Sequence, residues 1–298
     1  MKGESKQARM ALGLPQGCCA IREDISSAAS QEFARLTGID LGFPKSVTTE
    51  IEGMTGALIE GIAGDQAIDR EDMEKLDQLI HGYQVTVQEG TAPPNELEYA
   101  RTELARHVAK RTAAVATGDK ITAAMTKESM EKALASMVLT AQWDAKWDNL
   151  MVAGDQARPI DGGAAFPNRN LLGMQYGNPP EFAPPMSDLA KYPAASSNAG
   201  QPLPFATQPM EAALVQAIVG LNADDMINAM KARRTQLLQT VPALNTPEPL
   251  LSDESLEIQK ASIVGAQKIL RDNPGISLLA FTQAYEQWFL NWLPTFGT

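Results

Sequence analysis

The stretch from residue 144 to 167 constrains the fold of this chain more than any other part of the sequence. It reads DAKWDNLMVAGDQARPIDGGAAFP. An Asp stands five residues before an Asn, an apolar run follows, and a second Asp comes next in an Ile-Asp-Gly context. A short pair of strands would space these polar side chains around one site.

These residue types suit phosphoryl transfer from ATP. That reaction needs a carboxylate near the attacking hydroxyl, together with an Asn and a second Asp on magnesium. Catalysis then rests on positioning and on metal electrostatics, because the transferred group carries spread negative charge. Magnesium takes a few oxygen ligands from protein and the rest from phosphates and water. Asn149 and Asp161 fit that requirement.

A plainer interpretation holds for each residue taken alone. Asp144 and Asp148 can be solvated carboxylates at the end of a long helix, and Asn149 can cap that helix. The pair formed by Asp161 and Gly162 is also typical of a turn between strands. Short motifs call for this caution. Their order and spacing together nevertheless favour a catalytic site.

The segment resembles the catalytic core of the phosphatidylinositol 3/4-kinase-like superfamily, and most of all its type II phosphatidylinositol 4-kinase branch. That branch has an Asp-x-x-x-Asp-Asn loop, followed by an Ile-Asp-Asn-Gly-x-Ala-Phe-Pro metal-binding segment. The resemblance implies that Asp144 is the catalytic carboxylate and that Asn149 and Asp161 bind Mg²⁺. The chain departs from the pattern at Gly162, where the family often has Asn. It also departs at residues 145–146, where Ala-Lys replaces Arg-His or Arg-Gly.

The resemblance extends loosely over residues 31–234. Helical spacing over residues 27–37, ended by Gly38, places Glu32 where the family has the Glu that pairs with its nucleotide-binding Lys. The expected strand before that helix, residues 18–22, ends in Arg22 rather than Lys. Arg can hold phosphates through two nitrogens, but it is no conservative replacement for a compact ammonium. Lys2 and Lys6 are the other candidate cations.

Residues 43–64 predict a β-hairpin and a hinge. β-Branched residues over 47–51, a turn at 53–56 and an apolar run over 57–62 give this pattern, although residues 48–62 also have partial helical spacing. In the superfamily the second strand leads into the hinge that binds adenine through backbone groups. The resemblance assigns that role to Glu60, Gly61 and Ile62. Small residues there let the base approach the backbone closely.

Composition excludes several classes of protein. The 298 residues are 44% hydrophobic and 20% charged, which indicates a soluble globular protein. The net charge of −11 argues against nucleic-acid binding and against simple adsorption to anionic membranes. No apolar run is long enough for an integral membrane segment. The adjacent Cys18 and Cys19 cannot form a disulfide framework, so they are expected to be buried or, as in some type II lipid kinases, acylated.

The predicted fold class is α+β: a kinase-like two-lobed fold, with a reduced β N-lobe and hinge at residues 1–64 and a large, mainly helical C-lobe at 65–298. Ten prolines and six glycines over residues 154–209 predict a long loop, which either shapes a substrate site or links two helical halves. Aromatic residues over 288–296 are expected to plug the core, with a membrane or partner contact as the alternative. Helices are expected over 66–90, 95–117 with a break at Gly118 and Asp119, 126–141, 210–221, 223–240, 253–270 and 276–290.

We therefore expect an ATP- and Mg²⁺-dependent kinase that phosphorylates a protein hydroxyl or an inositol lipid. It would be cytoplasmic, or a bacterial effector secreted into a host cell without a cleaved signal peptide, where peripheral contact with a membrane or a host protein stays open. Two other classes compete. One is a catalytically inactive pseudokinase that binds nucleotide or protein, favoured because no full glycine-rich hairpin fits before residue 18. The other is an all-helical scaffold in which the motifs are accidental.

Overall fold

The computed structural model describes residues 2–3, 18–51, 54–66, 70–162, 165–167, 186–241 and 251–293. Helices and two small sheets make up this part of the chain, so the fold class is α+β and mostly helical. The strands are β1 (Lys2–Gly3), β2 (Ser46–Ile51), β3 (Met54–Ile59), β4 (Asp65–Gln66), β5 (Leu150–Ala153) and β6 (Gln156–Pro159). The helices are α2 (Cys18–Thr37), α3 (Arg70–Glu89), α4 (Pro94–Ala124), α5 (Lys127–Leu139), α7 (Met186–Leu189), α8 (Ala212–Gly220), α9 (Ala223–Thr240), α10 (Asp253–Asp272) and α11 (Leu278–Trp292), with a 3₁₀ turn η1 (Trp147–Asn149).

Both sheets are antiparallel and lie on either side of the expected hinge. The first has the order β1-β3-β2, and the second has the order β4-β5-β6. The hairpin predicted over residues 47–62 is confirmed, but its turn lies earlier in the chain than the predicted residues 53–56. Strand β3 begins at Met54, and Gly56 lies opposite Thr49 within the ladder. Turn residues 52 and 53 lie outside the described part of the chain.

The strand expected at residues 18–22 is wrong, because these residues form the first turns of α2. Ile21, Ile25, Ala29 and Phe33 recur every four residues, and none is more than 1% exposed. The apolar helical period therefore begins before residue 27 and continues the helix toward the N-terminus. Gly38 ends the helix as predicted, with a left-handed φ of 76° and its N–H donating to the Ala34 carbonyl at 2.8 Å.

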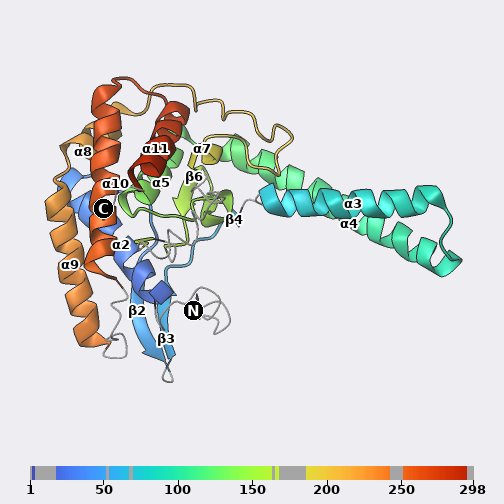
Figure 1. Cartoon of the computed structure of the whole chain (residues 1–298), viewed down its shortest axis with the longest axis horizontal. Helices are drawn as coiled ribbons and strands as arrows, with labels where there is room; N and C mark the ends of the chain where they lie inside the picture. Colours follow the sequence, from blue (N-terminus) through green and yellow to red (C-terminus); the bar gives the residue numbers. More distant parts are fainter. Residues whose placement is uncertain are drawn as a thin grey trace.

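Helices α3 and α4 form an antiparallel arm that projects from the rest of the molecule (Figure 1). The break predicted at Gly118 and Asp119 is wrong, since α4 runs on to Ala124. Gly118 serves close approach instead. A Cβ at this position would lie 2.4 Å from the Ser196 nitrogen and 2.6 Å from the Ala195 carbonyl carbon. The root of the arm therefore packs directly on the backbone of the 186–209 segment.

Asp119 stabilises the contact between α4 and the 186–209 segment. Its Oδ1 accepts hydrogen bonds from the Ser196 hydroxyl at 2.8 Å, the Ser197 N–H at 2.7 Å and the Ser197 hydroxyl at 2.8 Å. These bonds favour the charged carboxylate and hold the pKa of Asp119 below its usual range. Apart from the short helix α7, the described residues between 186 and 209 have no regular helix or strand, as their Pro and Gly content predicts.

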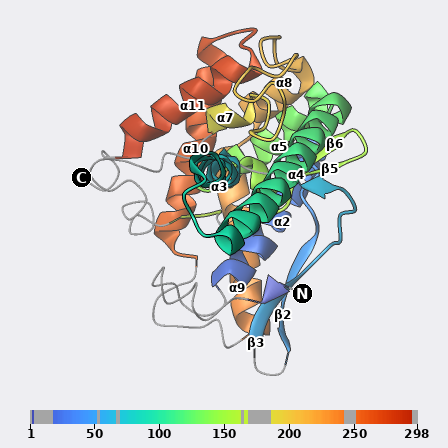
Figure 2. The same cartoon turned by 90° about the vertical axis from the view of Figure 1, so that its right-hand side faces the viewer.

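The main core lies between α2, α5 and the C-terminal helices, which lie behind the arm in Figure 2, where the arm points toward the viewer. The predicted helices over 223–240 and 253–270 are confirmed as α9 and α10, and Ser252 caps α10 by accepting from the Ser255 N–H at 3.1 Å. The predicted aromatic plug is confirmed at Phe289, while Trp288, Trp292 and Leu293 are partly exposed and pack against the core. Phe289 is 2% exposed, and Trp288 contacts the backbone of α10 at Gly265. Phe296 lies outside the described residues.

None of the helices in the described part of the chain is both long and apolar enough to cross a membrane.

Two helical glycines on the arm give a matched test of this packing. We expect Gly118→Ala to lower the free energy of unfolding by about 1–3 kcal/mol, because the added methyl meets fixed backbone. A Cβ at Gly82 of α3 would meet open space. Gly82→Ala should therefore raise stability by about 0.5–1 kcal/mol through helix propensity. Urea denaturation followed by circular dichroism checks both, and equal effects would show that α4 does not rest on the 186–209 segment.

Candidate active site

Helix α5 delivers the chain to the candidate site through a strained turn. Thr126 caps its start, with Oγ1 accepting from the Ser129 N–H at 3.3 Å. At its end, the Ala141 N–H donates to the Val138 carbonyl and the Gln142 N–H to the Met137 carbonyl, a Schellman arrangement. Ala141 has a φ of 48°, a left-handed conformation that usually requires glycine. The turn aims residues 142–149 at one end of the second sheet.

Asp144 and Asn149 lie together in the loop that follows. The Asn149 side chain is buried, and its Nδ2 donates to the Asp144 backbone carbonyl and lies 3.5 Å from Asp144 Oδ2. The Asp144 side chain is 35% exposed and so borders solvent. Lys146 Nζ lies 3.3 Å from Asp144 Oδ2 and 4.0 Å from Asp148 Oδ2. The loop thus places the Asp144 carboxylate beside the Lys146 ammonium, and the buried Asn149 amide supports the carboxylate from the protein interior.

The β5–β6 hairpin brings Asp161 to the same place. Leu150 pairs with Pro159, and the Ile160 N–H donates to the Asn149 carbonyl at 3.0 Å, which extends the pairing by one step. Asn149 and Asp161 therefore leave the same end of the hairpin. The Gln142 side-chain amide fixes this end further by donating to the Asp161 carbonyl at 2.6 Å. The structure thus brings Asp144 into contact with Asn149 and places Asp161 directly after the residue whose N–H bonds to the Asn149 carbonyl. These are the three residues that the sequence predicted to be catalytic.

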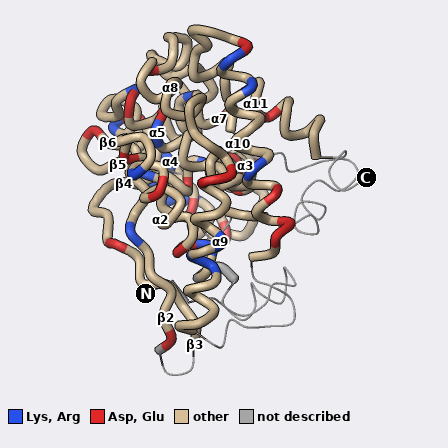
Figure 3. Tube along the Cα trace, turned by 90° about the vertical axis from the view of Figure 1, so that its left-hand side faces the viewer, with Lys and Arg blue, Asp and Glu red and all other residues tan. Residues whose placement is uncertain are grey.

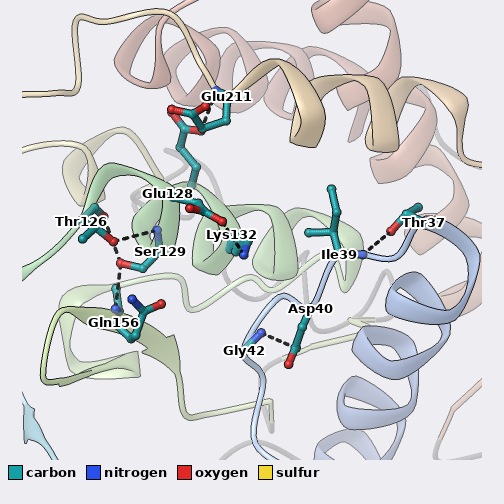
Figure 4. A network of polar contacts seen from close by, with 12 residues as sticks. Thr37, Ile39, Asp40, Gly42, Thr126, Glu128, Ser129, Lys132, Gln156 and Glu211 are labelled. Atoms are coloured by element: carbon teal, nitrogen blue, oxygen red, sulfur yellow. Dashed lines mark hydrogen bonds and ion pairs between the residues drawn. The ribbon is translucent and has the colours of Figure 1, made fainter.

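The start of α5 holds the other end of the hairpin, as Figure 4 shows for Thr126, Ser129 and Gln156. Ser129 Oγ donates to the Asp155 carbonyl at 3.2 Å and accepts from the Ala157 N–H at 3.0 Å. The same helix therefore positions the hairpin at its first turn and the Asp144 loop after its last turn. This shared support fixes the spacing between the two halves of the site.

Helix α2 closes the site from the opposite side. The Gly162 N–H donates to Glu23 Oε2 at 3.1 Å, and the Ser26 hydroxyl lies 3.4 Å from the Gly162 carbonyl. A Cβ at Gly162 would lie 2.7 Å from Ser26 Cβ and 2.8 Å from Phe43 Cζ. A side chain as large as Asn would therefore not fit at this position, between α2 and Phe43.

A second strained residue borders the same site. Phe166 is fully buried, has a φ of 52° and donates its N–H to the carbonyl of Thr140, the residue that precedes Ala141. Ala141 and Phe166 are the non-glycine residues with left-handed backbone in the described ranges. Backbone strain tends to persist at functional sites, where the surroundings enforce it. Its concentration here supports a functional role for this end of the hairpin.

Glu32, the residue expected to pair with a nucleotide-binding cation, lies elsewhere. It forms two hydrogen bonds with Arg35 of the same helix, at 2.6 and 2.7 Å, and these lower the pKa of Glu32. The carboxylate of α2 that reaches the site is Glu23, which sequence reasoning missed. The sequence does contain a signal for Glu23. The charged run Arg22, Glu23 and Asp24 stands inside a helical stretch that is buried.

Arg22 is buried on α2, not carried on a strand as expected. It is 2% exposed, and its Nε and Nη1 have no hydrogen-bond partner among the described residues. A buried polar group in this state is costly, so a bound acceptor would stabilise it. Of the alternative cations, Lys2 places its backbone beside Ala57 in the first sheet. Lys6 lies outside the described part of the chain.

The expected hinge residues join the two sheets. The Glu60 N–H donates to the Lys45 carbonyl at 2.8 Å, and the Lys45 N–H donates to Glu60 Oε2 at 3.1 Å. A Cβ at Gly61 would meet open space, and Ile62 is partly exposed. The site proper therefore holds no side chain from this segment in the described contacts, although the segment has the connecting position that a hinge requires.

The close approach at Gly162 yields a stability test. Gly162→Ala should cost about 1–3 kcal/mol, because the methyl would push α2 away from the hairpin. The matched control is Gly61→Ala at the open hinge, which should change stability by no more than about 0.5 kcal/mol. Thermal unfolding of both variants checks this. A wild-type melting temperature for Gly162→Ala would mean that α2 does not pack on the Asp161 segment.

Comparison with known proteins adds no relative. No protein-family model matches the chain, and no curated protein or solved structure matches it at a significant level. The contacts described above therefore carry the functional argument by themselves.

Proposed function

We propose that this protein is an ATP- and Mg²⁺-dependent kinase with a two-lobed, kinase-like arrangement. The first sheet and α2 would form a reduced N-lobe, and the second sheet with the remaining helices would form the C-lobe. One observation carries the proposal: Asp144 and Asn149 are in contact, and Asp161 leaves the same end of the β5–β6 hairpin, next to the Gly162 that Glu23 of α2 holds. This is the set of oxygen groups that phosphoryl transfer requires.

The donor set suits Mg²⁺ bound with a nucleotide. Because Asn149 Nδ2 donates to Asp144, its Oδ1 is the atom that can serve as a metal ligand. The Asp161 carboxylate supplies the second oxygen group. The described residues contain no group of three or more His, Cys, Asp or Glu placed to hold a metal. A nucleotide-bound Mg²⁺ needs fewer protein ligands, since phosphates and water complete its six.

Asp144 is suited to handle the acceptor hydroxyl. It borders solvent, so a substrate can reach it, and the buried Asn149 amide holds its orientation. In this role the carboxylate accepts a hydrogen bond from the hydroxyl and takes its proton as the new O–P bond forms and the bond to ADP breaks. Lys146, 3.3 Å away, places a positive charge where negative phosphate oxygens would gather.

Arg22 is the described cation best suited to the nucleotide phosphates. Its guanidinium is buried, and two of the guanidinium nitrogens have no hydrogen-bond partner among the described residues. Arg22 also directly precedes Glu23, which accepts the Gly162 N–H. Guanidinium groups bind phosphate strongly through paired N–H groups. A catalytically inactive pseudokinase is the second candidate, favoured because this cation lies on a helix, whereas the kinase pattern carries it on a strand. Such a protein would bind Mg²⁺ and ATP without transfer.

We expect Asp161→Ala to abolish phosphoryl transfer and to leave the melting temperature without nucleotide nearly unchanged. The physical reason is loss of a metal ligand at a partly exposed position. Radiolabel transfer from ATP to lysate proteins and to inositol-lipid vesicles is the measurement. The control is Asp155→Ala, at the other end of the same hairpin, which should transfer like wild type. ATP turnover at the wild-type rate in Asp161→Ala would refute the kinase assignment.

Asp144→Asn separates catalysis from structure. If Asp144 accepts the hydroxyl proton, turnover should fall by roughly 10²-fold or more while ATP affinity is kept. Calorimetric titration with Mg²⁺ and ATP gives the affinity, and the transfer assay gives the turnover. Equal turnover in wild type and variant would remove Asp144 from the mechanism. Lost ATP binding would instead assign the loop a structural role.

A further inference from the structure

A pocket of about 510 Å³ lies directly beside the candidate catalytic loop, at the root of the projecting arm. Trp147, between Lys146 and Asp148 in the loop, forms part of its wall. Trp147 is 6% exposed, and its indole Nε1 lies 3.4 Å from the Asp188 carbonyl. The remaining walls come from α3, α4 and the 186–209 segment. A group bound in this pocket would therefore sit next to the loop that holds Asp144.

The pocket carries more acidic than basic side chains. Its wall contains Glu74, Asp77 and Asp188 against Arg111 and Lys191, a net formal charge of −1. Arg111 Nε lies 2.5 Å from Asp77 Oδ1, and Lys191 Nζ lies 2.8 Å from Asp188 Oδ1, so each cation forms an ion pair with a carboxylate of the wall. Charges of both signs are interspersed over the molecule (Figure 3), and the chain as a whole carries −11. This field attracts a positive group and repels a negative one.

Two aromatic side chains complete the pocket. Trp147 and Tyr192 both line it. Aromatic faces attract guanidinium and ammonium groups, and the interaction gains strength where water is excluded. The volume is in the range of pockets that enclose a large part of a bound group. Acidic walls with aromatic surfaces are the combination that recognises Arg or Lys side chains.

We propose that this pocket binds an Arg or Lys side chain of a protein substrate, next to the hydroxyl that is phosphorylated. The assignment rests on the proposed kinase function for the neighbouring loop. The arm supports a macromolecular substrate, because α3 and α4 extend from the pocket and offer a long surface beside it (Figure 1). An inositol-lipid headgroup is the disfavoured alternative, since its phosphate would meet a net negative wall.

Peptide binding tests the pocket without requiring catalysis. The probe is a fluorescein-labelled serine peptide flanked by arginines, titrated with the full chain and followed by anisotropy. We expect Glu74→Gln with Asp77→Asn to weaken binding at least about tenfold, because the wall changes from net negative to net positive. The control is Glu96→Gln with Glu98→Gln, exposed acids near the start of α4 and outside the pocket. It makes the same change in total charge and should alter affinity less than about twofold.

Several outcomes would overturn the pocket assignment. They are absence of binding, equal affinity for a glutamate-flanked peptide, and equal weakening by the two double variants. Asp77 and Arg111 form an exposed pair of small stabilising effect, so the pocket variant should fold. Glu74→Gln alone provides a second variant that keeps this pair. Its affinity for the arginine peptide should fall in the same direction, and an unchanged value would count against the pocket.

Adding ATP and Mg²⁺ separates this inference from the kinase proposal. Both hold if the arginine peptide is labelled and the pocket variant raises its KM with little change in kcat. A peptide that binds through the pocket but is never labelled, when no other substrate is labelled either, overturns the kinase function alone. Labelling of peptides without regard to the pocket variant overturns the pocket alone. Labelling confined to phosphatidylcholine vesicles that contain phosphatidylinositol overturns the protein-substrate class and keeps the kinase.

Discussion

The rest of the structure depends on the hydrogen bonds that the buried acidic side chains at the start of α2 accept. Asp24 is 1% exposed and receives two hydrogen bonds from Arg233 of α9, at 2.7 and 2.9 Å, and one from the Thr48 N–H of β2, at 2.7 Å. Its neighbour Glu23 receives the Gly162 N–H. One helix turn therefore joins the first sheet, a C-terminal helix and the candidate site. Removing one partner of such a buried pair commonly costs about 3–5 kcal/mol, because the other charge is left without compensation.

This arrangement explains how a loop could hold the geometry of the proposed site. The Asp144 loop has little regular structure of its own, but the strained end of α5 fixes one side of it and the hairpin fixes the other through Asn149. Helix α2 fixes the neighbouring Asp161 segment through Gly162. Functional side chains on loops work when a rigid scaffold positions them. Ala141 and Phe166 have left-handed backbone near this loop, and the Phe166 N–H donates to the carbonyl of Thr140, which precedes Ala141.

The arm adds a second level of organisation. Its root packs on the 186–209 segment at Gly118, and the same segment supplies Asp188, Lys191 and Tyr192 to the pocket beside Trp147. The long Pro- and Gly-rich stretch is therefore neither a simple linker nor a free loop in its described part. It joins the arm to the Asp144 loop, so a partner bound along the arm would lie close to the proposed chemistry.

The sequence by itself determined features that depend on a few neighbouring residues: the cap at Ser252, the end of α2 at Gly38, the β2–β3 hairpin, and the spacing that gathers Asp144, Asn149 and Asp161. These follow from periodicity, capping and turn chemistry, which act locally. Only the tertiary structure decided that Glu23, rather than Glu32, reaches the candidate site. The choice between two carboxylates of one helix was made by a glycine 139 residues away in the chain. Contacts of that range leave no local pattern, because they depend on which surfaces meet after the elements have formed.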